Sequence, residues 1–345
     1  MTILSVAYPL LPVGPDSGGG AEQILFLIDR QLAGWGHRSI VIAARGSQVS
    51  GELFETPVFE GEITDQVRDD AQRAHLRRLE RARDQYSIDL IHFHGLDFYN
   101  YLPERKVPML ATLHLPPSWY PDRIFGLPHI QLNCVSCAQA GAAPGKSLPV
   151  IPNGIDTEQF QGQPRERKLL VWLGRICPEK GTEIALRVAH ALDLPLVIAG
   201  PAHPFRAHEN YFTDCVQPLL DEKRKYVGQV GLASKRKLLA EARCVLIPSL
   251  VPETSSLVAM EAISSGTPVI AFRSGALPEI VEHGQTGLLV DSEEEMMSAI
   301  GKIHEVSSET CRMRARLRFD YKQMVQGYLG LYQKLISEHL PTRCA

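Results

Sequence analysis

The sequence predicts an α/β protein with two doubly wound parallel sheets. Short apolar runs alternate with longer segments of helical periodicity, and this alternation occurs in two successive series. Strands that are apolar throughout are typical of parallel sheets whose two faces are covered by helices. A segment rich in proline, glycine and polar residues, 149–164, separates the two series and predicts a hinge between two domains.

The expected elements follow in chain order. In the first series we expect helices at 21–34 and 65–86, and strands at 3–8, 39–44, 90–94, 109–113 and 132–136. In the second series we expect helices at 182–192, 235–242, 256–265 and 293–303, and strands at 168–173, 196–199, 226–230, 244–247, 269–271 and 287–290. The apolar spacing over 319–339 predicts a final amphipathic helix that packs on the body of the protein.

The composition excludes several classes of protein. With 345 residues, 44% of them hydrophobic, the chain is long enough for two domains with sizeable cores. The 36 basic and 39 acidic residues nearly balance, which argues against a nucleic-acid partner. Seven cysteines do not suit a disulfide scaffold. The N-terminus lacks the basic start of a signal peptide, and no apolar run is long enough to span a membrane, so we expect a cytoplasmic protein.

A glycine cluster, Gly18 to Gly20, lies between the first expected strand and the first expected helix. Glycines allow backbone N–H groups to approach an anion, and a helix N-terminus adds unpaired donors, so a phosphate is the expected ligand. The cluster is not a dinucleotide fingerprint, because Gln23 occupies the position of the third glycine. A tight structural turn is the alternative interpretation.

Three other short motifs favour structural roles. The segment AGAAPGKS at 140–147 is similar to a phosphate-binding P-loop, but the prolines and glycine that follow exclude the helix such a loop requires. Cys134 and Cys137 lack a second ligand pair for zinc, and no helix is expected to start there, so we interpret them as two half-buried thiols. His92 and His94 share one strand face without a third ligand nearby, which makes a metal site the minority interpretation.

Two cations follow an apolar strand in the second series. Arg175 and Lys180 lie in the segment LGRICPEKG, at the turn from this strand to a helix. An arginine fork and a lysine point charge near one turn suit a diphosphate. Solvated surface charge is the alternative for each residue taken alone.

Two glutamates flank the start of a later expected helix. If this helix begins near Ser256, Glu253 lies in the loop before it and Glu261 in its second turn. Carboxylates are poor partners for a phosphate but good acceptors for the vicinal hydroxyls of a ribose or hexose. Cations and carboxylates together therefore indicate a nucleotide sugar. Because the chain has no Asp-x-Asp pair that could bridge a metal to the diphosphate, we expect a metal-independent site without a cofactor.

With these residues in view, the sequence resembles the family 4 retaining glycosyltransferases of the GT-B fold. The resemblance covers nearly the whole chain, and it is specific because many short motifs occur in order, together with the Glu-x7-Glu spacing of Glu253 and Glu261. The motifs are SGGGAEQ (17–23), AGWGHRSIVIAA (33–44), DLIHFHG (89–95), ATLHLPP (111–117), IPNGID (151–156), LGRICPEKG (173–181), PETSSLVAMEA (252–262), SSGTPVIA (264–271) and GALPEIVEHGQTGLLV (275–290).

The resemblance implies an architecture. It implies two Rossmann-like domains facing across a cleft, an acceptor-binding one at 1–155 and one for the nucleotide sugar at 156–320. The helix within 321–345 would cross back onto the first domain. Family members often have glycine where this chain has Thr254 and Ser256, which puts the shape of the sugar pocket in doubt, and the N-terminal domain is short.

The resemblance also implies roles for individual residues. Arg175 and Lys180 would stabilise the leaving diphosphate, Glu253 would bond hydroxyls of the transferred sugar, and His114 would lie beside the reacting sugar. Glu261 would hold the ribose hydroxyls, and the base would stack near 227–231. The implied donor-binding residues are Gly18, Gly19, Asn153, Arg175, Lys180, Gly228, Thr254, Ser255, Ser256, Leu257, Val258 and Glu261.

The expected activity is transfer of a hexosyl unit, with UDP as the favoured nucleotide, to a glycan, lipid-linked or small-molecule acceptor. A nucleotide-sugar epimerase of the same fold and a catalytically silent nucleotide-sugar-binding subunit are the alternatives. The basic runs at 223–225 and 235–237, and the arginines between 312 and 318, suit either solvated surface or peripheral contact with anionic lipid. The sequence leaves the sugar, the acceptor and the oligomeric state open.

Overall fold

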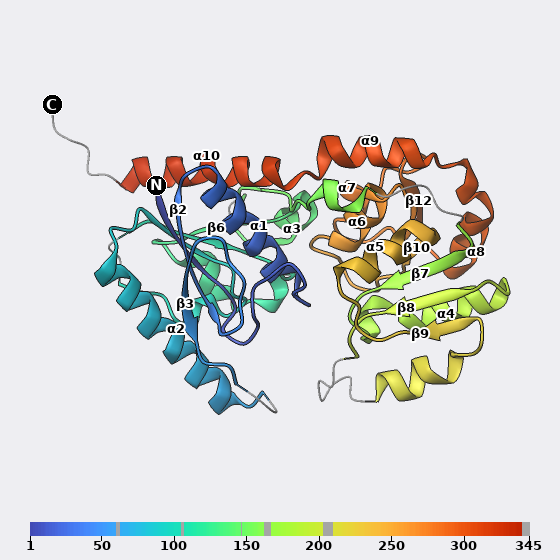
Figure 1. Ribbon diagram of the computed structural model, residues 1–345, viewed down its shortest axis with the longest axis horizontal. Coiled ribbons are helices and arrows are strands. Elements are labelled where there is room, and N and C mark those ends of the chain that lie inside the picture. The colour runs from blue at the N-terminus through green and yellow to red at the C-terminus, as the bar shows by residue number, and fades with distance from the viewer. Residues whose placement is uncertain (60–62, 105–106, 146, 162–166, 203–209, 340–345) are drawn as a thin grey trace. The chain divides into compact units, whose positions relative to one another are not determined.

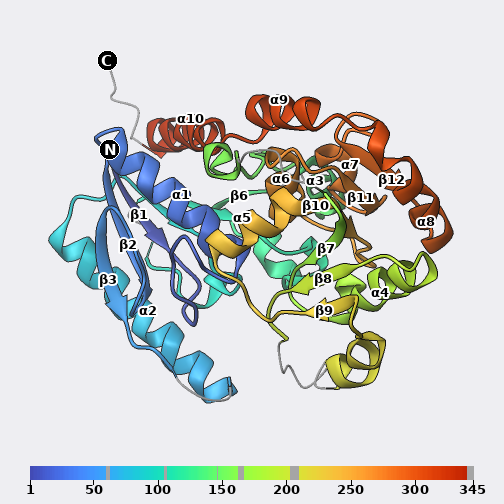
Figure 2. The same ribbon diagram turned by 45° about the vertical axis from the view of Figure 1, so that its right-hand side comes forward.

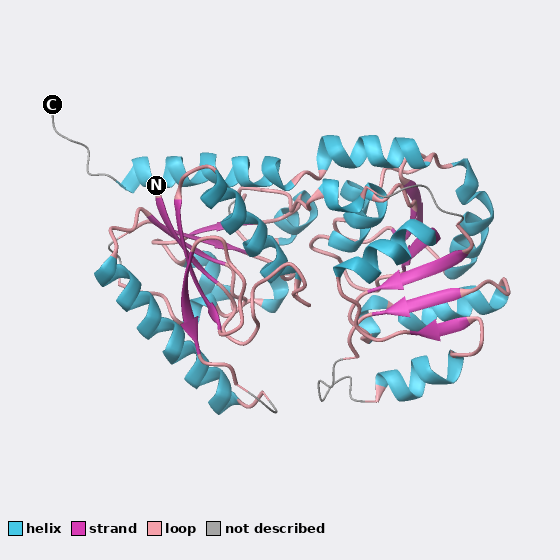
Figure 3. Cartoon of the chain, viewed as in Figure 1, coloured by secondary structure: helices cyan, strands magenta, loops and turns pink. Residues whose placement is uncertain are grey.

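The computed structural model describes residues 1–59, 63–104, 107–145, 147–161, 167–202 and 210–339 (Figure 1). The chain divides into two compact units, one of Met1–Asn153 with Tyr321–Ala345 and the other of Gly154–Asp320. Each unit has a six-stranded parallel sheet with helices packed against it (Figure 3). The expected α/β class with two doubly wound, Rossmann-like sheets is therefore confirmed.

The first unit orders its sheet β3-β2-β1-β4-β5-β6. Apart from residues at strand ends and in β3, the strand side chains are almost all buried, as expected for strands covered on both faces. The strands are β1 (Thr2–Val6), β2 (Arg38–Ala44), β3 (Glu52–Thr56), β4 (Leu90–Phe93), β5 (Met109–Thr112) and β6 (Gln131–Asn133).

The helices of the first unit are α1 (Gly20–Gly34), α2 (Asp65–Gln85), α3 (Cys137–Ala142) and α10 (Tyr321–His339). The helix α1 contacts both β2 and α10, whereas α2 contacts β2 and β3. Both ribbon views show α1 and α10 together on one side of the sheet and α2 on the other (Figures 1 and 2). The final helix, expected over 319–339, is α10, which buries its apolar positions.

The second unit orders its sheet β12-β11-β10-β7-β8-β9. Its core is continuous and includes Trp172 on the central strand β7. The strands are β7 (Leu169–Leu173), β8 (Leu196–Ala199), β9 (Arg224–Tyr226), β10 (Ala242–Ile247), β11 (Val269–Phe272) and β12 (Gly287–Val290). The helices are α4 (Thr182–Ala191), α5 (Leu232–Glu241), α6 (Leu257–Ser264), α7 (Leu277–Ile280), α8 (Glu293–Lys302) and α9 (Ser308–Arg318).

Five elements differ from the expectation, namely β3, β9, α9 and the short helices α3 and α7. The edge strand β3 was not expected, because only two of its five side chains are buried. The helix α9 was missed because it buries only Cys311 and Ala315 among polar and charged residues. The strand β9 ends at Tyr226, where 226–230 was expected to begin, because its own residues are Arg224 and Lys225 at a sheet edge.

The helix α3 corrects the interpretation of the cysteine pair. The side chain of Ser136 caps this helix by accepting a hydrogen bond from the Gln139 amide at 3.1 Å, so a helix does begin at Cys137. Cys134 is buried and Cys137 is exposed, and neither is bonded in a disulfide. In the described residues 147–156, no helix follows the segment similar to a P-loop, and its Lys146 lies outside the described residues. None of the helices in the described part of the chain is long and apolar enough to cross a membrane.

Candidate functional site

The site in the second unit begins at the turn after β7. Gly181 closes this turn with φ +60°, a left-handed conformation that glycine adopts without a steric penalty. A Cβ at this position would overlap the Pro248 carbonyl oxygen, so the turn lies directly against the loop that follows β10. The Leu250 amide also donates to the Glu179 carbonyl at 2.8 Å. The two loops are therefore held together at the carboxyl edge of adjacent parallel strands.

Glu253 is fixed in the loop after β10 by its own backbone. Its carbonyl accepts a hydrogen bond from the Ala276 amide at 2.7 Å. Gly275, with φ +55°, packs so closely that a Cβ there would overlap the Glu253 backbone. The carboxylate is only 8% exposed, so its charge requires a partner inside the protein.

That partner is Lys180. Its ammonium nitrogen lies 2.6 Å from Glu253 Oε1 and 2.8 Å from Oε2, and the Ser249 hydroxyl also donates to Oε1. The sequence predicts both residues as ligands of one donor, with Lys180 on the diphosphate and Glu253 on the sugar. The structure brings them together as an ion pair, in which each charge is neutralised before any substrate binds.

The second glutamate follows the same loop into α6. Ser256 caps this helix by accepting a hydrogen bond from the Ala259 amide at 3.3 Å, which places Glu261 in the second turn as the sequence predicts. Glu261 is only 3% exposed, and its Oε1 lies 2.6 Å from the ammonium nitrogen of Lys235. Burial raises the pKa of the Glu261 carboxyl, and the Lys235 charge and hydrogen bond oppose that rise.

Lys235 is a residue that the sequence analysis missed. It lies in α5, in the basic run 235–237 that the analysis interpreted as solvated surface or lipid contact, yet its side chain is 18% exposed. Two arginines of α9 are likewise paired, because Arg314 and Arg318 both contact Glu282. Position could have identified Lys235, since it shares a helix face with the buried Leu239, four residues later.

Arg175 differs from the two lysines. Its side chain is exposed, and its guanidinium forms no ion pair or hydrogen bond with any residue that the structure describes. An exposed guanidinium at the edge of the sheet is available to an anionic ligand. Gly228 lies in the loop after β9 with φ +73°, and its carbonyl accepts a hydrogen bond from the Gly200 amide at 2.8 Å.

The remaining predicted donor residues of the second unit surround the start of α6. Thr254 and Ser255 precede the cap, and Leu257 and Val258 form the first turn with half-buried side chains. The Ser255 hydroxyl is buried and has no hydrogen-bond partner among the described residues. These positions therefore combine the first amide groups of a helix with a hydroxyl that has no partner among the described residues.

In the first unit, Gly19 is the N-cap of α1 and Gly18 precedes it in an exposed position. The N-cap residue has no side chain to cap the helix, but the carboxylate of Glu22 accepts a hydrogen bond from its own backbone amide in the first turn. Glu22 was not predicted from the sequence. Its carboxylate is buried directly against Gly19, where a Cβ would overlap it. Burial raises the pKa of Glu22. A carboxyl group beside the proposed phosphate loop disfavours an anion there unless that carboxyl is protonated.

His114 belongs to a group of histidines at the ends of β4 and β5. Its Nε2 lies 3.2 Å from Nδ1 of the buried His94, and burial lowers the pKa of His114 to about 4. His92 bonds through Nδ1 to the Tyr332 hydroxyl of α10 and through Nε2 to the Thr112 hydroxyl, each at 2.7 Å. The histidines are therefore neutral hydrogen-bonding groups within a buried network.

Asn153 is the last residue of the first unit's main segment. It is buried, and its side-chain carbonyl has no hydrogen-bond partner among the described residues. No group of three or more His, Cys, Asp or Glu side chains suited to a metal ion occurs in the described part of the chain.

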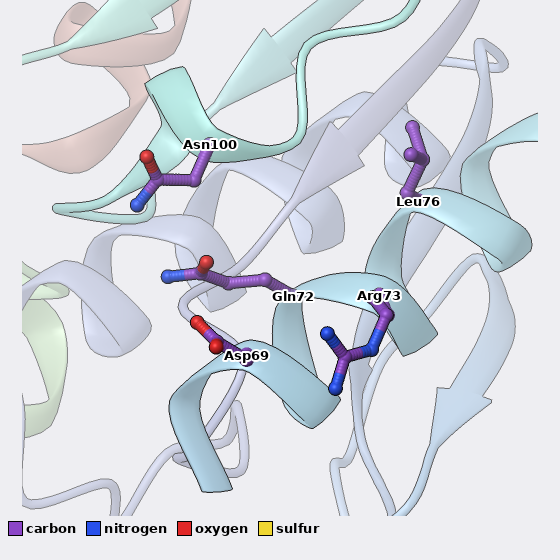
Figure 4. Close-up of a pocket in the computed structure, with 5 residues that line it drawn as sticks. All are labelled: Asp69, Gln72, Arg73, Leu76 and Asn100. Carbon is purple, nitrogen blue, oxygen red and sulfur yellow. The ribbon is translucent and has the colours of Figure 1, made fainter. Parts of the chain in front are cut away.

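Figure 4 shows a pocket of about 260 Å³ in the first unit. Four polar residues and one leucine, from α2 and the short turn at Phe98–Asn100, line it, and none of the predicted site residues does. The lining residues are Asp69, Gln72, Arg73, Leu76 and Asn100. Gln72 also donates to Asp97 at 2.8 Å, so part of this lining is already committed to an internal hydrogen bond.

Comparison with known proteins finds a family match within the second unit. Residues 167–305 match the family model described as Glycosyl transferases group 1. The D-inositol 3-phosphate glycosyltransferase of Corynebacterium efficiens is 32% identical over 162 residues, which cover 43% of this chain and 38% of that protein. The MMP alpha-(1->4)-mannosyltransferase of Mycolicibacterium hassiacum is 32% identical over 217 residues, which cover 56% of this chain and 49% of that protein. The chain thus spans half or less of the length of these relatives.

Solved structures share the fold over the whole chain. Sucrose-phosphate synthase from Thermosynechococcus elongatus aligns with a TM-score of 0.79 at 18% identity and covers 98% of this chain and 100% of that one. Anabaena Alr3699/HepE, solved in complex with UDP and glucose, aligns with a TM-score of 0.77 at 19% identity and covers 97% and 100%. The structural neighbours thus confirm the expected GT-B fold.

Proposed function

We propose that this chain is a retaining glycosyltransferase that moves a hexosyl unit from a nucleotide-diphosphate sugar to an acceptor hydroxyl, without a metal ion. UDP is the favoured nucleotide. The observation that carries the proposal is the edge of the second sheet, where two buried carboxylates, each paired with one lysine, lie in the loop after β10 and in the helix α6 that follows this loop. This edge belongs to the segment that matches the group 1 glycosyltransferases.

The charge and hydrogen-bonding capacity of each residue indicate which part of the donor it would bind. Arg175 is an exposed cation. Lys180 has three N–H donors, and it contacts both carboxylate oxygens of Glu253. A diphosphate would attract both cations, and Lys180 would turn from Glu253 towards it. The carboxylate of Glu253 would then accept hydrogen bonds from sugar hydroxyls, which replace the lost ammonium. Glu261 would hold the ribose hydroxyls of the nucleotide.

The reaction requires stabilisation of the leaving diphosphate. Arg175 and Lys180 would balance the negative charge that develops as the glycosidic bond breaks, which is the kind of electrostatic contribution that dominates such transfers. The two carboxylates described at this edge, Glu253 and Glu261, are both assigned to hydroxyl groups of the donor, so neither is proposed as a nucleophile. The acceptor would therefore attack from the face that the diphosphate leaves, and the diphosphate would take the acceptor proton. His114 would contribute as a neutral hydrogen-bonding group beside the sugar.

Relatives guide the choice of ligands. A structural neighbour binds UDP-glucose, and sequence relatives are named for transfer to D-inositol 3-phosphate and for mannosyl transfer. We therefore propose a UDP-hexose donor and a glycan, lipid-linked or small-molecule acceptor, in the cytoplasm or at the periphery of its membrane. An epimerase of the same fold and a silent nucleotide-sugar-binding subunit are the alternatives.

A thermal-shift screen with UDP-, GDP- and ADP-sugars tests the proposal at the level of binding. A ligand that binds only the folded state raises the melting temperature by mass action. We expect one nucleotide series to raise it, equally with and without EDTA, and Glu261→Gln to reduce the shift. No shift with any of the three series would overturn the proposal. Conversion of a donor into its epimer without release of the nucleotide would favour the epimerase.

A further inference from the structure

A half-buried lysine in α5 pairs with the carboxylate that the proposed function assigns to the nucleotide. Lys235 extends from the first turns of α5 to Glu261 Oε1 at 2.6 Å, and its ammonium also lies 5.7 Å from the centre of the Phe160 ring. The next two residues of the same basic run, Arg236 and Lys237, are exposed. Position on the helix, and not the charge of the run, sets Lys235 apart.

Glu261 would be costly to bury as an anion without this partner. Removal of a carboxylate from water favours its neutral form, and burial raises the pKa of Glu261 accordingly. Among the described residues, Lys235 is the charged group that opposes this effect. The arginines of α9, which packs against α6, act elsewhere, since Arg314 pairs with Glu282 and Arg312 lies beside Gly266, beyond the end of α6.

The contact with Lys235 uses only one carboxylate oxygen. Glu261 Oε2 is buried and has no hydrogen-bond partner among the described residues. A carboxylate held through one oxygen, with the other unused, is suited to accept a hydrogen bond from a ligand hydroxyl. The short helix α6 and its cap fix the backbone position of Glu261, and the contact with Lys235 fixes the position of its carboxylate.

We propose that Lys235 is a positioning residue that holds Glu261 as a charged, oriented acceptor for the ribose hydroxyls of the nucleotide. This inference rests on the proposed function. Lys235 itself need not touch the donor, because its ammonium is engaged with Glu261 and lies near the Phe160 ring. Its loss should therefore weaken the recognition of the ribose and leave the chemical step almost unchanged.

Calorimetric titration tests the inference with the nucleoside diphosphate, among UDP, GDP and ADP, that gives the largest thermal shift. We expect Lys235→Met to raise the dissociation constant about 10-fold or more at pH 7, within the range for one lost charged contact. Without the lysine, Glu261 should take up a proton at higher pH, so the defect should grow as pH falls from 8.5 to 6. Lys237→Met, on the exposed part of the same run, should bind like the unsubstituted protein.

Two further comparisons separate positioning from a general structural role. The 2′,3′-dideoxy form of the same nucleotide should bind the unsubstituted protein and Lys235→Met with nearly equal affinity, because the ribose hydroxyls that would donate to Glu261 are missing. Lys235→Arg should restore most of the affinity, and it remains informative if Lys235→Met does not fold. In a Glu261→Gln background, Lys235→Met should add less than about twofold.

The outcomes distinguish the inference from the proposed function. If no nucleoside diphosphate binds the unsubstituted protein, the proposed function fails and the positioning role fails with it. If a nucleotide binds and Lys235→Met matches Lys237→Met at every pH, the proposed function stands and the positioning role is wrong. Equal loss of affinity for the ribo and 2′,3′-dideoxy forms would also overturn it, because that result indicates a general structural defect.

Discussion

Replacement of Lys180 by methionine should show how much one ion pair, between Lys180 and Glu253, contributes to the stability of the two loops of the site. The substitution keeps most of the side-chain length and removes the ammonium, which lies 2.6 and 2.8 Å from the two oxygens of Glu253. It would leave a carboxylate that is only 8% exposed without its counter-ion. The Ser249 hydroxyl would remain as a hydrogen-bond donor to Glu253.

The expected loss of stability follows from the burial of the pair. Removal of one partner from a fully buried ion pair costs about 3–5 kcal/mol. The Lys180 side chain is 28% exposed and Ser249 stays in place, so the loss should be smaller, about 2 kcal/mol. Glu253→Gln should cost less, because a neutral amide is easier to bury than an unpaired carboxylate.

Urea denaturation of the two single variants and the double variant measures the coupling between these residues. We expect a coupling free energy of about 1–2 kcal/mol, as for neighbouring charges that share one contact. Lys237→Met, an exposed lysine of α5, is the matched control and should shift the transition by less than about 0.5 kcal/mol. Additive effects of Lys180→Met and Glu253→Gln would show that the pair does not contribute to stability and would refute this reasoning.

The same variant also tests the proposed chemistry. Loss of one electrostatic donor to a leaving group typically lowers turnover by about 10²–10³-fold. Lys180→Met should show this decrease at saturating donor, with Lys237→Met as the control. Near-normal turnover would contradict the role of Lys180 as the cation of the leaving diphosphate, whatever its effect on stability.

Three further predictions concern the scaffold. Burial lowers the pKa of His75 from 6.5 to about 4, so the unfolded chain takes up its proton first as pH falls. The free energy of unfolding should therefore decrease by up to about 3 kcal/mol between these pH values. His75→Phe should flatten the pH dependence of the urea midpoint, and an unchanged dependence would contradict this prediction. Tyr332→Phe removes the hydroxyl bonded to His92 and should cost about 1–3 kcal/mol in the same assay, whereas no change would mean that this contact is not maintained in solution. Gly181→Ala must fit a Cβ against the Pro248 carbonyl and should lower both the melting temperature and turnover. Gly228→Ala, also at positive φ but in open space, should lower the free energy of unfolding by only about 1–2 kcal/mol. Similar losses of melting temperature in the two variants would contradict the close packing at Gly181.

The sequence pattern predicted most of the strands but not the edge strands β3 and β9. Central strands such as β4 and β10 are mostly apolar, as burial on both faces favours, and they were predicted to within two residues at each end. The edge strands β3 and β9 carry charged residues because one side of each faces no further strand. Local hydrophobicity therefore fails where the strand is least buried.

The site was predictable as a set of residue types but not as a set of pairs. The positions of Glu253 and Glu261 around the start of α6 follow from local helix signals, so they could be placed from the sequence. The pairing of Lys180 with Glu253 spans 73 residues and that of Lys235 with Glu261 spans 26, and no local pattern specifies such contacts. The position of Lys235 on the face of the buried Leu239 distinguishes it from the exposed lysine two residues later, but only tertiary packing identifies Glu261 as its partner.

The most direct test of the central claim is release of the nucleoside diphosphate from UDP-, GDP- and ADP-sugars, followed with and without a panel of glycan, inositol and lipid acceptors. We predict release from one donor series, acceleration by an acceptor, indifference to EDTA, and a loss of about 10²-fold or more in Lys180→Met. Tight binding of a donor without release of its nucleotide under any of these conditions would contradict the account and indicate a silent binding subunit.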